Sequence, residues 1–299
     1  MTVYEAVIDG LEKVLQRNII LKRQYNLFKT FSNWWLYYAI KMGFRTSGVF
    51  LFVTRRGVSI SVPKKLYALF KSIFLREHYL EGLVLPLPVR PTIIDVGANV
   101  GFFSLFAASK WGAEVFAYEP VQANYEEMAN NVKANPHVTI NCRRMAVSSV
   151  SGDIEIFFDK TATLTTTATA CPSEPKTWKI EKVKAVTLLD ILESEGLRTV
   201  DLLKMDCEGS EFSILYQTSP ETLRRINQMA IEVHGNRDAD NHNANALRAF
   251  LTATGFTVRT NENGTYLWAR QDDKADRGKG LHNNGIHADV GGVACAADA

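Results

Sequence analysis

One short segment, Pro91–Phe103, constrains the fold more than any other part of the sequence. The mostly apolar run Ile93–Val96 is typical of a buried parallel strand. Gly97 and Gly101 then allow a tight turn into a helix predicted over 102–109. The free N–H groups in the first turn of such a helix point toward the loop before it. A strand, a glycine loop and a helix therefore predict an α/β fold with a cofactor-binding loop.

The spacing within the loop narrows the choice of cofactor. A dinucleotide-binding loop has the pattern G-x-G-x-x-G, which would need glycine where this chain has Asn99 and Phe102. Here the pattern is D-x-G-x-x-x-G, with Asp95 at the carboxyl end of the strand. A carboxylate in that position would repel a pyrophosphate but attract a cationic amine. S-adenosylmethionine (SAM) carries such an amine and a sulfonium, so we predict a SAM site that includes Asp95, Gly97, Asn99 and Gly101.

A second acidic residue ends the next predicted strand. The segment Glu114–Pro120 is apolar up to Tyr118 and is followed by Glu119, about 20 residues after the glycine turn. A carboxylate at that position can accept hydrogen bonds from both ribose hydroxyls, so we predict that Glu119 binds the ribose of SAM. Met145 and Ala146 follow the third predicted strand, and we predict that they flank the adenine ring.

Four segments together resemble the FkbM-type SAM-dependent methyltransferases: IIDVGANVGFFSLFAA, AYEP, VDLLKMDCEGSEFSIL and MAIEVHG. The resemblance covers about Val49 to Arg270, and its most specific part is the D-x-E-G-x-E run from Asp206 to Glu211. It implies a Rossmann-like class I methyltransferase, with a mostly parallel sheet closed by an antiparallel C-terminal hairpin. It also implies O-methyl transfer to a hydroxyl of a small-molecule, sugar or lipid-like acceptor.

Three side chains at the ends of the fourth and fifth predicted strands are candidates for the chemistry. Asp206 ends one strand, and Glu232 and His234 point the same way from the next. An aliphatic hydroxyl attacks a methyl group well only when its proton is removed. Either His234 or Asp206 is a general base, or all three side chains bind Mg²⁺ or Mn²⁺, which lowers the hydroxyl pKa. We prefer the metal-free base, because sequence spacing does not show that ligands converge.

Other acidic residues and other functions compete with this interpretation. Glu208 and Glu211 lie in the first turn of a predicted helix, where the helix dipole stabilises acids that have no catalytic role. His78 adjoins an apolar helix stripe and is assigned no role. A nicotinamide-dependent oxidoreductase is a second candidate function, disfavoured by Asn99 and Phe102. A non-catalytic SAM-fold binding module is a third.

The chain divides into three predicted parts: an N-terminal helical extension over 1–48, a methyltransferase domain over 49–270 and a disordered tail over 271–299. Aromatic residues are dense between Phe28 and Phe44, but the apolar run is shorter than the ~18 residues that a membrane span needs. A lid or docking helix is expected there, and peripheral contact with a membrane or a partner stays open. The polar stretch 159–182 predicts a long loop for acceptor recognition.

Composition sets limits on partners and compartment. Lys and Arg total 34 against 32 acidic residues, so the net charge of +2 gives no reason to expect a nucleic-acid partner. The cysteines are far apart and form no C-x-x-C pair, which indicates free thiols in a reducing compartment: Cys142, Cys171, Cys207 and Cys295. The N-terminus has no apolar signal core. We therefore predict a cytoplasmic protein, with no prediction of oligomeric state.

Overall fold

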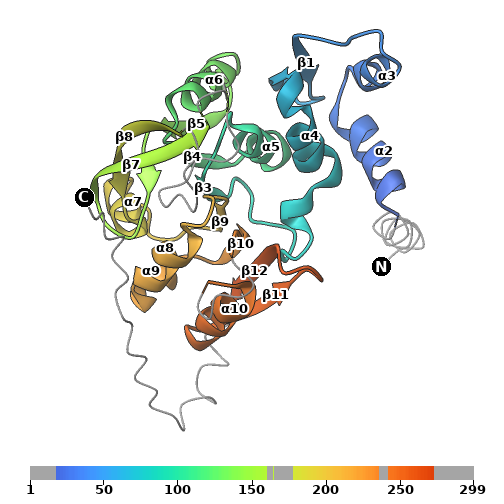
Figure 1. The fold of residues 1–299 in the computed structure, drawn as a ribbon. Coiled ribbons are helices and arrows are strands. Elements are labelled where there is room, and N and C mark those ends of the chain that lie inside the picture. Colours follow the sequence, from blue (N-terminus) through green and yellow to red (C-terminus); the bar gives the residue numbers. More distant parts are fainter. Residues whose placement is uncertain (1–17, 160–163, 165–177, 236–241, 273–299) are drawn as a thin grey trace, which may run out of the picture.

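A computed structural model describes residues 18–159, 164, 178–235 and 242–272. Its central feature is a seven-stranded sheet with the strand order β11-β12-β10-β9-β3-β4-β5 (Figure 1). The strands are β3 (Thr92–Val96), β4 (Glu114–Tyr118), β5 (Thr139–Arg143), β9 (Leu202–Met205), β10 (Gln228–Glu232), β11 (Phe256–Thr260) and β12 (Tyr266–Gln271). Five strands are parallel, and β12 pairs antiparallel with β10 and β11. The predicted mostly parallel sheet with a C-terminal hairpin is confirmed.

Helices connect the strands, and some of them begin at side-chain caps. They are α5 (Phe102–Trp111), α6 (Gln122–Lys133), α7 (Leu188–Ser194), α8 (Glu211–Gln217), α9 (Pro220–Leu223) and α10 (Ala244–Ala253). A capping box begins α7, because Thr187 and Asp190 each bond to the other's backbone N–H. Ser219 caps α9, with Pro220 at its first position. Among the described residues, no helix combines the length and the apolar character needed to cross a bilayer.

An N-terminal layer covers one side of α5, as Figure 1 shows. It consists of α2 (Ile19–Thr30), α3 (Trp35–Lys41), β1 (Val49–Val53), β2 (Ser59–Pro63), η1 (Lys64–Leu66), α4 (Tyr67–Lys71), the π-helical turn η2 (Ser72–Arg76) and η3 (His78–Leu80). The β1–β2 hairpin forms a sheet of its own. β2 bonds to α6 and to the residues just after it, since the N–H group of Ser61 donates to the side chain of Asn131 and that of Ser59 donates to the side chain of Asn135.

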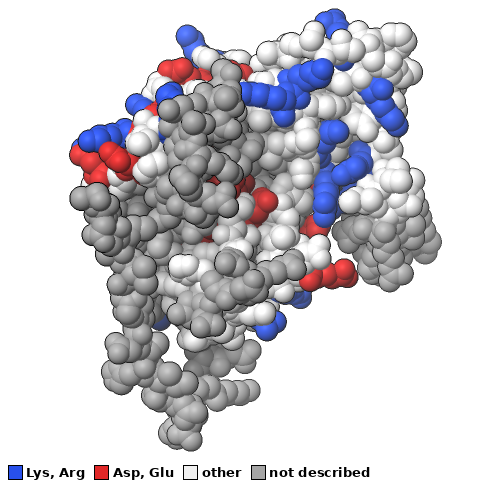
Figure 2. Space-filling view, in the orientation of Figure 1, with Lys and Arg blue, Asp and Glu red and all other residues white. Residues whose placement is uncertain are grey.

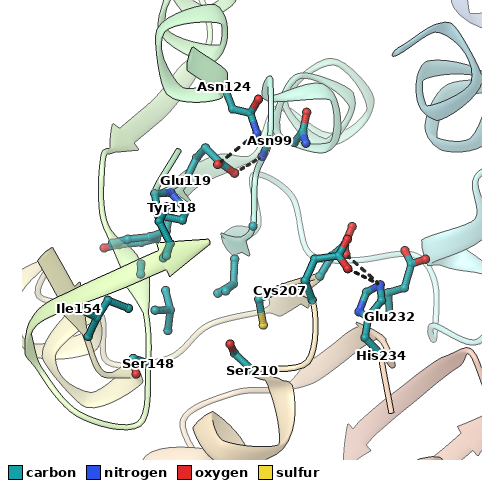
Figure 3. Close-up of a pocket in the computed structure, with 18 of the residues that line it drawn as sticks. Asn99, Tyr118, Glu119, Asn124, Ser148, Ile154, Cys207, Ser210, Glu232 and His234 are labelled. Atoms are coloured by element: carbon teal, nitrogen blue, oxygen red, sulfur yellow. Dashed lines mark hydrogen bonds and ion pairs between the residues drawn. The ribbon is translucent and has the colours of Figure 1, made fainter. Parts of the chain in front are cut away.

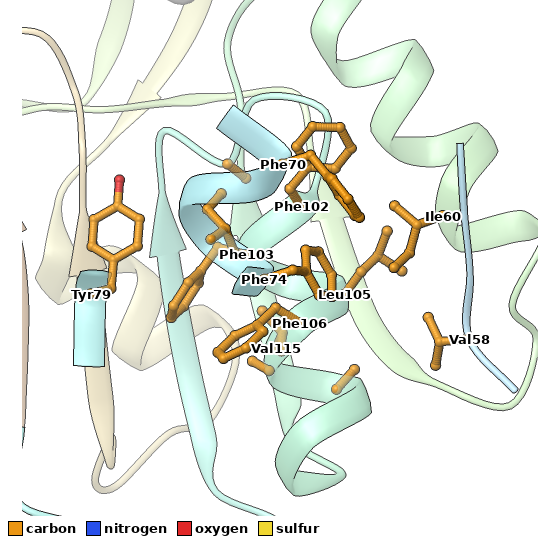
Figure 4. Close-up of a cluster of buried hydrophobic side chains, with 14 of the residues drawn as sticks. Val58, Ile60, Phe70, Phe74, Tyr79, Phe102, Phe103, Leu105, Phe106 and Val115 are labelled. Atoms are coloured by element: carbon orange, nitrogen blue, oxygen red, sulfur yellow. The ribbon is translucent and has the colours of Figure 1, made fainter. Parts of the chain in front are cut away.

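A cluster of phenylalanine rings joins this layer to the central sheet (Figure 4). Phe70 lies at its centre, with its ring centroid 4.6 Å from that of Phe52 and 5.9 Å from that of Phe102. Phe31 and Phe74 also contact Phe70, and all five side chains are buried. Burying one such ring stabilises the fold by about 1.5–3 kcal/mol. The cluster therefore fixes the N-terminal layer to α5, the helix that follows the glycine loop.

A small second sheet follows β5 and corrects one prediction. It contains β6 (Ala146–Val147), β7 (Gly152–Asp159) and β8 (Trp178–Val186) in the order β6-β8-β7. The loop predicted through residue 182 is therefore wrong at its end, since β8 already begins at Trp178. Asp159, the first residue of that predicted loop, belongs to β7, and Gln271, the first residue of the tail predicted over 271–299, belongs to β12. The rest of the loop, except Leu164, lies outside the described residues, as do the predicted helical residues 1–17 and residues 273–299 of the predicted tail. In the described part of the chain, Cys142 and Cys207 are free thiols.

His78 in η3 is expected to make the folding stability of the protein depend on pH. Its side chain is 2% exposed, and Nδ1 lies 3.0 Å from the carbonyl oxygen of Ser72. Burial lowers the pKa of His78 to about 4, whereas an unfolded histidine has a pKa of about 6.5. Below about pH 6.5 the unfolded state therefore binds more protons than the folded state, so stability is lost as pH falls toward 4.

We expect the free energy of unfolding, measured with urea, to fall by about 2 kcal/mol more in the wild type than in His78→Gln between about pH 7 and pH 5. The glutamine variant is the matched reference, because it keeps a polar side chain at position 78 but does not titrate. Equal pH dependence in the two proteins would show that His78 is not the group responsible.

Candidate functional site

The described residues form a pocket at the carboxyl ends of β3, β4, β9 and β10 (Figure 3). The chain passes from β3 to β4 and β5 on one side, then returns to β9 and β10 on the other side of β3. The point where the strand order reverses is the usual ligand site of open α/β sheets. The pocket lies at this point.

The glycine loop is shaped by contacts that only glycine permits. Gly97 has φ +70°, and a Cβ atom on it would lie 1.8 Å from the carbonyl oxygen of Asp206. Gly101 has φ +81° and precedes α5, and a Cβ atom there would lie 2.8 Å from Cγ of Met128. Both positions therefore require glycine. Gly97 lines the pocket, whereas Gly101 does not, so Gly101 shapes the loop instead of forming the pocket surface.

Glu119 lies at the end of β4, and its carboxylate is held by the glycine loop and by α6. The side chain is 4% exposed. Its oxygens accept hydrogen bonds from the N–H groups of Asn99 at 2.8 Å and Val121 at 3.0 Å, and from Nδ2 of Asn124 at 3.3 Å. Burial raises the pKa of Glu119 to about 7, although these hydrogen bonds act in the opposite direction. Asn99 and Glu119 both line the pocket, where the sequence placed them (Figure 3).

Of the two residues predicted to flank adenine, one lines the pocket and the other does not. Ala146 lines the pocket together with its neighbours Val147 and Ser148. Met145 does not, since its side chain packs against the hydrophobic core of the sheet. The structure thus corrects the prediction for Met145 and adds Ile154 of β7 to the apolar side of the pocket.

Asp95 was predicted to bind the amine of the cofactor directly, but the structure places its side chain outside the pocket. Its side chain is 0% exposed and is not part of the pocket surface. Oδ2 accepts a hydrogen bond from Ser104 at 2.7 Å, and Oδ1 lies 3.1 Å from Nζ of Lys204. Asp95 and Lys204 are register partners on the parallel strands β3 and β9. Asp95 is therefore the buried counter-ion of a buried lysine, beneath the glycine loop.

Lys204 is a site residue that the sequence analysis missed. Its ammonium donates hydrogen bonds to the carbonyl oxygen of Gly97 at 2.8 Å and of Val96 at 3.3 Å, and lies 3.9 Å from Oδ2 of Asp206. Burial alone would lower the pKa of Lys204, but Asp95 and Asp206 outweigh burial and raise it. The lysine is therefore charged, and it ties the glycine loop to Asp206.

The three predicted catalytic residues, Asp206, Glu232 and His234, all line the pocket. Tyr79, from η3, connects two of them: its hydroxyl lies 2.8 Å from Oδ2 of Asp206 and 3.0 Å from Oε2 of Glu232. A hydroxyl has one proton and can donate fully to only one carboxylate. Burial and the charge of Asp206 raise the pKa of Glu232, which favours its protonated form. A protonated Glu232 can then donate to Tyr79 while Tyr79 donates to Asp206.

Glu211 orients the ring of His234 through a contact with its Nδ1 atom. The Glu211 side chain is 0% exposed and accepts hydrogen bonds from the N–H groups of Cys207 at 3.0 Å and Gly209 at 2.9 Å. Its Oε1 also lies 2.9 Å from Nδ1 of His234. Burial alone would lower the pKa of His234, but the hydrogen bond and charge of Glu211 and the charge of Glu208 outweigh it and raise the pKa to about 9. Glu211 therefore has a positioning role that its place in a helical first turn does not reveal.

The residues grouped for cation binding differ from the predicted set. Nε2 of His234 lies 3.8 Å from Asp206 and 3.9 Å from Glu208. One ligand atom from each of these three residues lies within 4.8 Å of the others, and Glu232 is not in the group. Glu232 instead bonds to Tyr79. Asp206, Glu208 and His234 are thus the residues that could hold a metal ion, with Glu208 in place of Glu232.

The pocket has two chemically different ends, which Figure 3 shows at opposite sides of Cys207. At one end Glu119 and Asn99 meet between β4 and α5. At the other end Asp206, Glu232 and His234 gather at the tips of β9 and β10. The first end fits the sugar of a nucleotide, and the second can accept a proton or hold a cation.

Comparisons with known proteins agree with this geometry. A family model described as a Methyltransferase FkbM domain matches residues 95–258, more than half of the chain. Methyltransferase sdnD of Sordaria araneosa is 26% identical over 194 residues, which cover 55% of this chain and 73% of that protein. The 31-O-demethyl-FK506 methyltransferase FkbM of Streptomyces tacrolimicus is 29% identical over 219 residues, which cover 64% of this chain and 81% of that protein.

A solved structure is similar over a smaller share of its length. The crystal structure of methyltransferase FkbM from Methylobacillus flagellatus KT matches with a TM-score of 0.43 and 14% sequence identity. The match covers 69% of this chain and 53% of that protein, so the chain spans about half of its length.

Proposed function

Because the chain belongs to the FkbM methyltransferase family, we propose that it transfers a methyl group from SAM to a hydroxyl of a small-molecule, sugar or lipid-like acceptor. The observation that carries this proposal is a single pocket with a nucleotide-type carboxylate at one end and a proton-accepting group at the other. The relative from Streptomyces tacrolimicus is named for methyl transfer to 31-O-demethyl-FK506, which supports an oxygen acceptor.

The residues at the β4 end fit the sugar and base of SAM. A carboxylate offers about four lone-pair positions, and Glu119 uses three of them for hydrogen bonds within the protein. The remaining position can accept a ribose hydroxyl. Gly97 lines the pocket without a side chain, while Ala146 and Ile154 supply apolar surface for adenine. These residues would hold the cofactor, which supplies a methyl group already activated by a sulfonium.

Asp206 is the residue best placed to take the proton of the acceptor hydroxyl. It lies at the tip of β9, beside the loop that begins at Gly97. Tyr79 and Lys204 approach its Oδ2 at 2.8 Å and 3.9 Å, and these contacts hold the carboxylate in place. Asp206 would accept the hydroxyl proton, while the cofactor would supply the methyl group with cleavage of its methyl–sulfur bond and would leave as a neutral thioether. His234 supports the carboxylates of Asp206 and Glu208 from the opposite side.

A divalent ion is the second way to activate the hydroxyl, and one observation favours it. The carboxylate of Glu211 contacts Nδ1 of His234. Nε2 of the same ring faces Asp206 and Glu208. A carboxylate behind a histidine is the arrangement usual for histidine ligands of metals.

Removal of metal separates the two mechanisms. With Asp206 as a base acting alone, we expect the methyl transfer rate after dialysis against EDTA to equal that of the untreated protein. Rates are measured by mass spectrometry with isotopically labelled SAM. A loss of rate that Mg²⁺ or Mn²⁺ restores would assign the activation to an ion held by Asp206, Glu208 and His234.

The proposed function itself is tested by incubating the protein with labelled SAM and an extract of small metabolites and lipids. We expect one product that gains a single labelled methyl group on an oxygen. SAM binding without any labelled product would favour a non-catalytic binding module. Calorimetric binding of NAD without binding of SAM would favour the oxidoreductase and reject the proposal.

A further inference from the structure

The N-terminal layer has a charge pattern that methyl transfer does not explain. Between Glu12 and Glu77 every charged residue is Lys or Arg. The whole chain, in contrast, is almost balanced, with 34 basic and 32 acidic residues. On the face shown in Figure 2, Lys and Arg side chains gather over the N-terminal layer. This layer is therefore a cationic surface on a nearly neutral protein.

The same layer exposes large apolar side chains. Met42 is 64% exposed and Phe44 is 76% exposed, in a loop whose residues 41–49 are all exposed. Trp35 is 56% exposed and lies seven residues before Met42, so the two share one side of α3. Leu51 on β1 is also 56% exposed. Met42 and Phe44 lie between α3 and β1, whereas Trp35 lies on α3 and Leu51 on β1.

The helix and strand that carry these exposed side chains pack against the hydrophobic core. On α3 and β1, Leu36, Phe50 and Phe52 are buried next to the exposed positions. The side chain of Asn33 bonds to both the carbonyl oxygen of Leu51 at 2.8 Å and the N–H group of Val53 at 2.9 Å. The apolar groups are thus held outward by a fixed backbone.

We propose that this part of the molecule docks on an anionic membrane surface. The docking surface consists of Trp35, Lys41, Met42, Phe44, Arg45, Val49 and Leu51. A leaflet with acidic headgroups offers negative charge at the level of Lys41 and Arg45 and an apolar layer beneath it for the tips of Met42 and Phe44. An all-basic stretch with protruding apolar groups matches both layers of such a membrane.

The docking surface is coupled to the pocket through one short helix. In α4, Leu69 lines the pocket while its neighbour Phe70 packs on Phe52 of β1. The docking surface is therefore connected to the pocket wall through Phe52 and α4. The inference does not depend on the proposed function, since its test measures only binding to lipid.

The test is co-sedimentation of the full chain with vesicles. We expect binding to vesicles of phosphatidylcholine and phosphatidylserine in equal parts, weaker binding in high salt, and little binding to phosphatidylcholine alone. The double variant Met42→Ser/Phe44→Ser should bind about tenfold more weakly. The double variant Lys41→Gln/Arg45→Gln should lose about tenfold on the mixed vesicles only.

Val89→Ser is the matched control, because Val89 is 94% exposed but lies outside the docking surface. It should bind like the wild type, and circular dichroism should show all variants folded. The proposal is overturned if the wild type binds neither kind of vesicle, or if Met42→Ser/Phe44→Ser binds as well as Val89→Ser. Self-association without lipid that Met42→Ser/Phe44→Ser abolishes would assign the surface to a second copy of the chain and also overturn it.

Discussion

Replacing Asp206 with Asn is expected to lower kcat by about a thousandfold, within the range of 10²–10⁴ typical of a lost general base. The amide keeps the size of the side chain but cannot accept the hydroxyl proton. The affinity for SAM should stay within about twofold, because its sugar and base are assigned to the other end of the pocket. Initial rates with the acceptor found by labelling, together with calorimetry of SAM binding, measure both quantities.

Three variants make this result specific to Asp206. Tyr79→Phe removes the hydroxyl that lies 2.8 Å from Asp206 and should lower kcat by a smaller factor, about tenfold. Glu208→Gln should matter little for a metal-free base but should be severe if an ion is bound. Glu193→Gln, on exposed surface, should be silent. Near-normal turnover by Asp206→Asn would remove Asp206 from the base role.

Replacing Glu119 with Ala is expected to weaken SAM binding by about 10- to 100-fold, which corresponds to about 1–3 kcal/mol. The buried carboxylate is the only acceptor assigned to the ribose hydroxyls, and its loss leaves their hydrogen bonds unmade. Calorimetry with SAM alone gives the dissociation constant without an acceptor. Glu126→Ala, on the exposed side of α6, is the matched control.

The pH dependence of SAM binding gives an independent readout for Glu119. Burial raises the pKa of Glu119 to about 7, so part of the unliganded protein carries a protonated carboxyl near neutral pH. Ribose hydroxyls favour the ionised form, so the affinity of the wild type should fall as pH drops below about 7. Glu119→Gln should lose this dependence. An unchanged affinity in Glu119→Ala would refute the ribose assignment.

The sequence predicted the individual strands and turns of the sheet because their signals are local. Ile93–Val96 is an apolar strand, Gly97 is required by a backbone contact, and Thr187–Asp190 is a capping box formed within four residues. The start of β8, from Trp178 to Lys182, was missed because the lysines in this stretch suggested a loop. In the structure Lys182 pairs across the strands with Glu155, as charged residues of an exposed sheet can.

Tyr79 and Lys204, the site residues that were not predicted from the sequence, make contacts with segments far away in the chain. Tyr79 meets Asp206 across 127 positions of sequence, and nothing near Tyr79 indicates that contact. Lys204 did carry a usable signal, since a lysine within an apolar strand is buried only with a partner. Its register partner is Asp95. That pairing explains why Asp95 is beneath the loop and not in the pocket.

Tyr79 also bears on which fragment of the protein could be studied alone. The segment matched by the family model begins at residue 95 and ends at residue 258. A fragment cut at those limits would lack the Tyr79 hydroxyl, and with it Trp268, whose indole N–H donates to the Tyr79 carbonyl oxygen at 2.8 Å. Such a fragment would keep the glycine loop and Glu119. The end of its pocket that contains Asp206 and Glu232 would be incomplete.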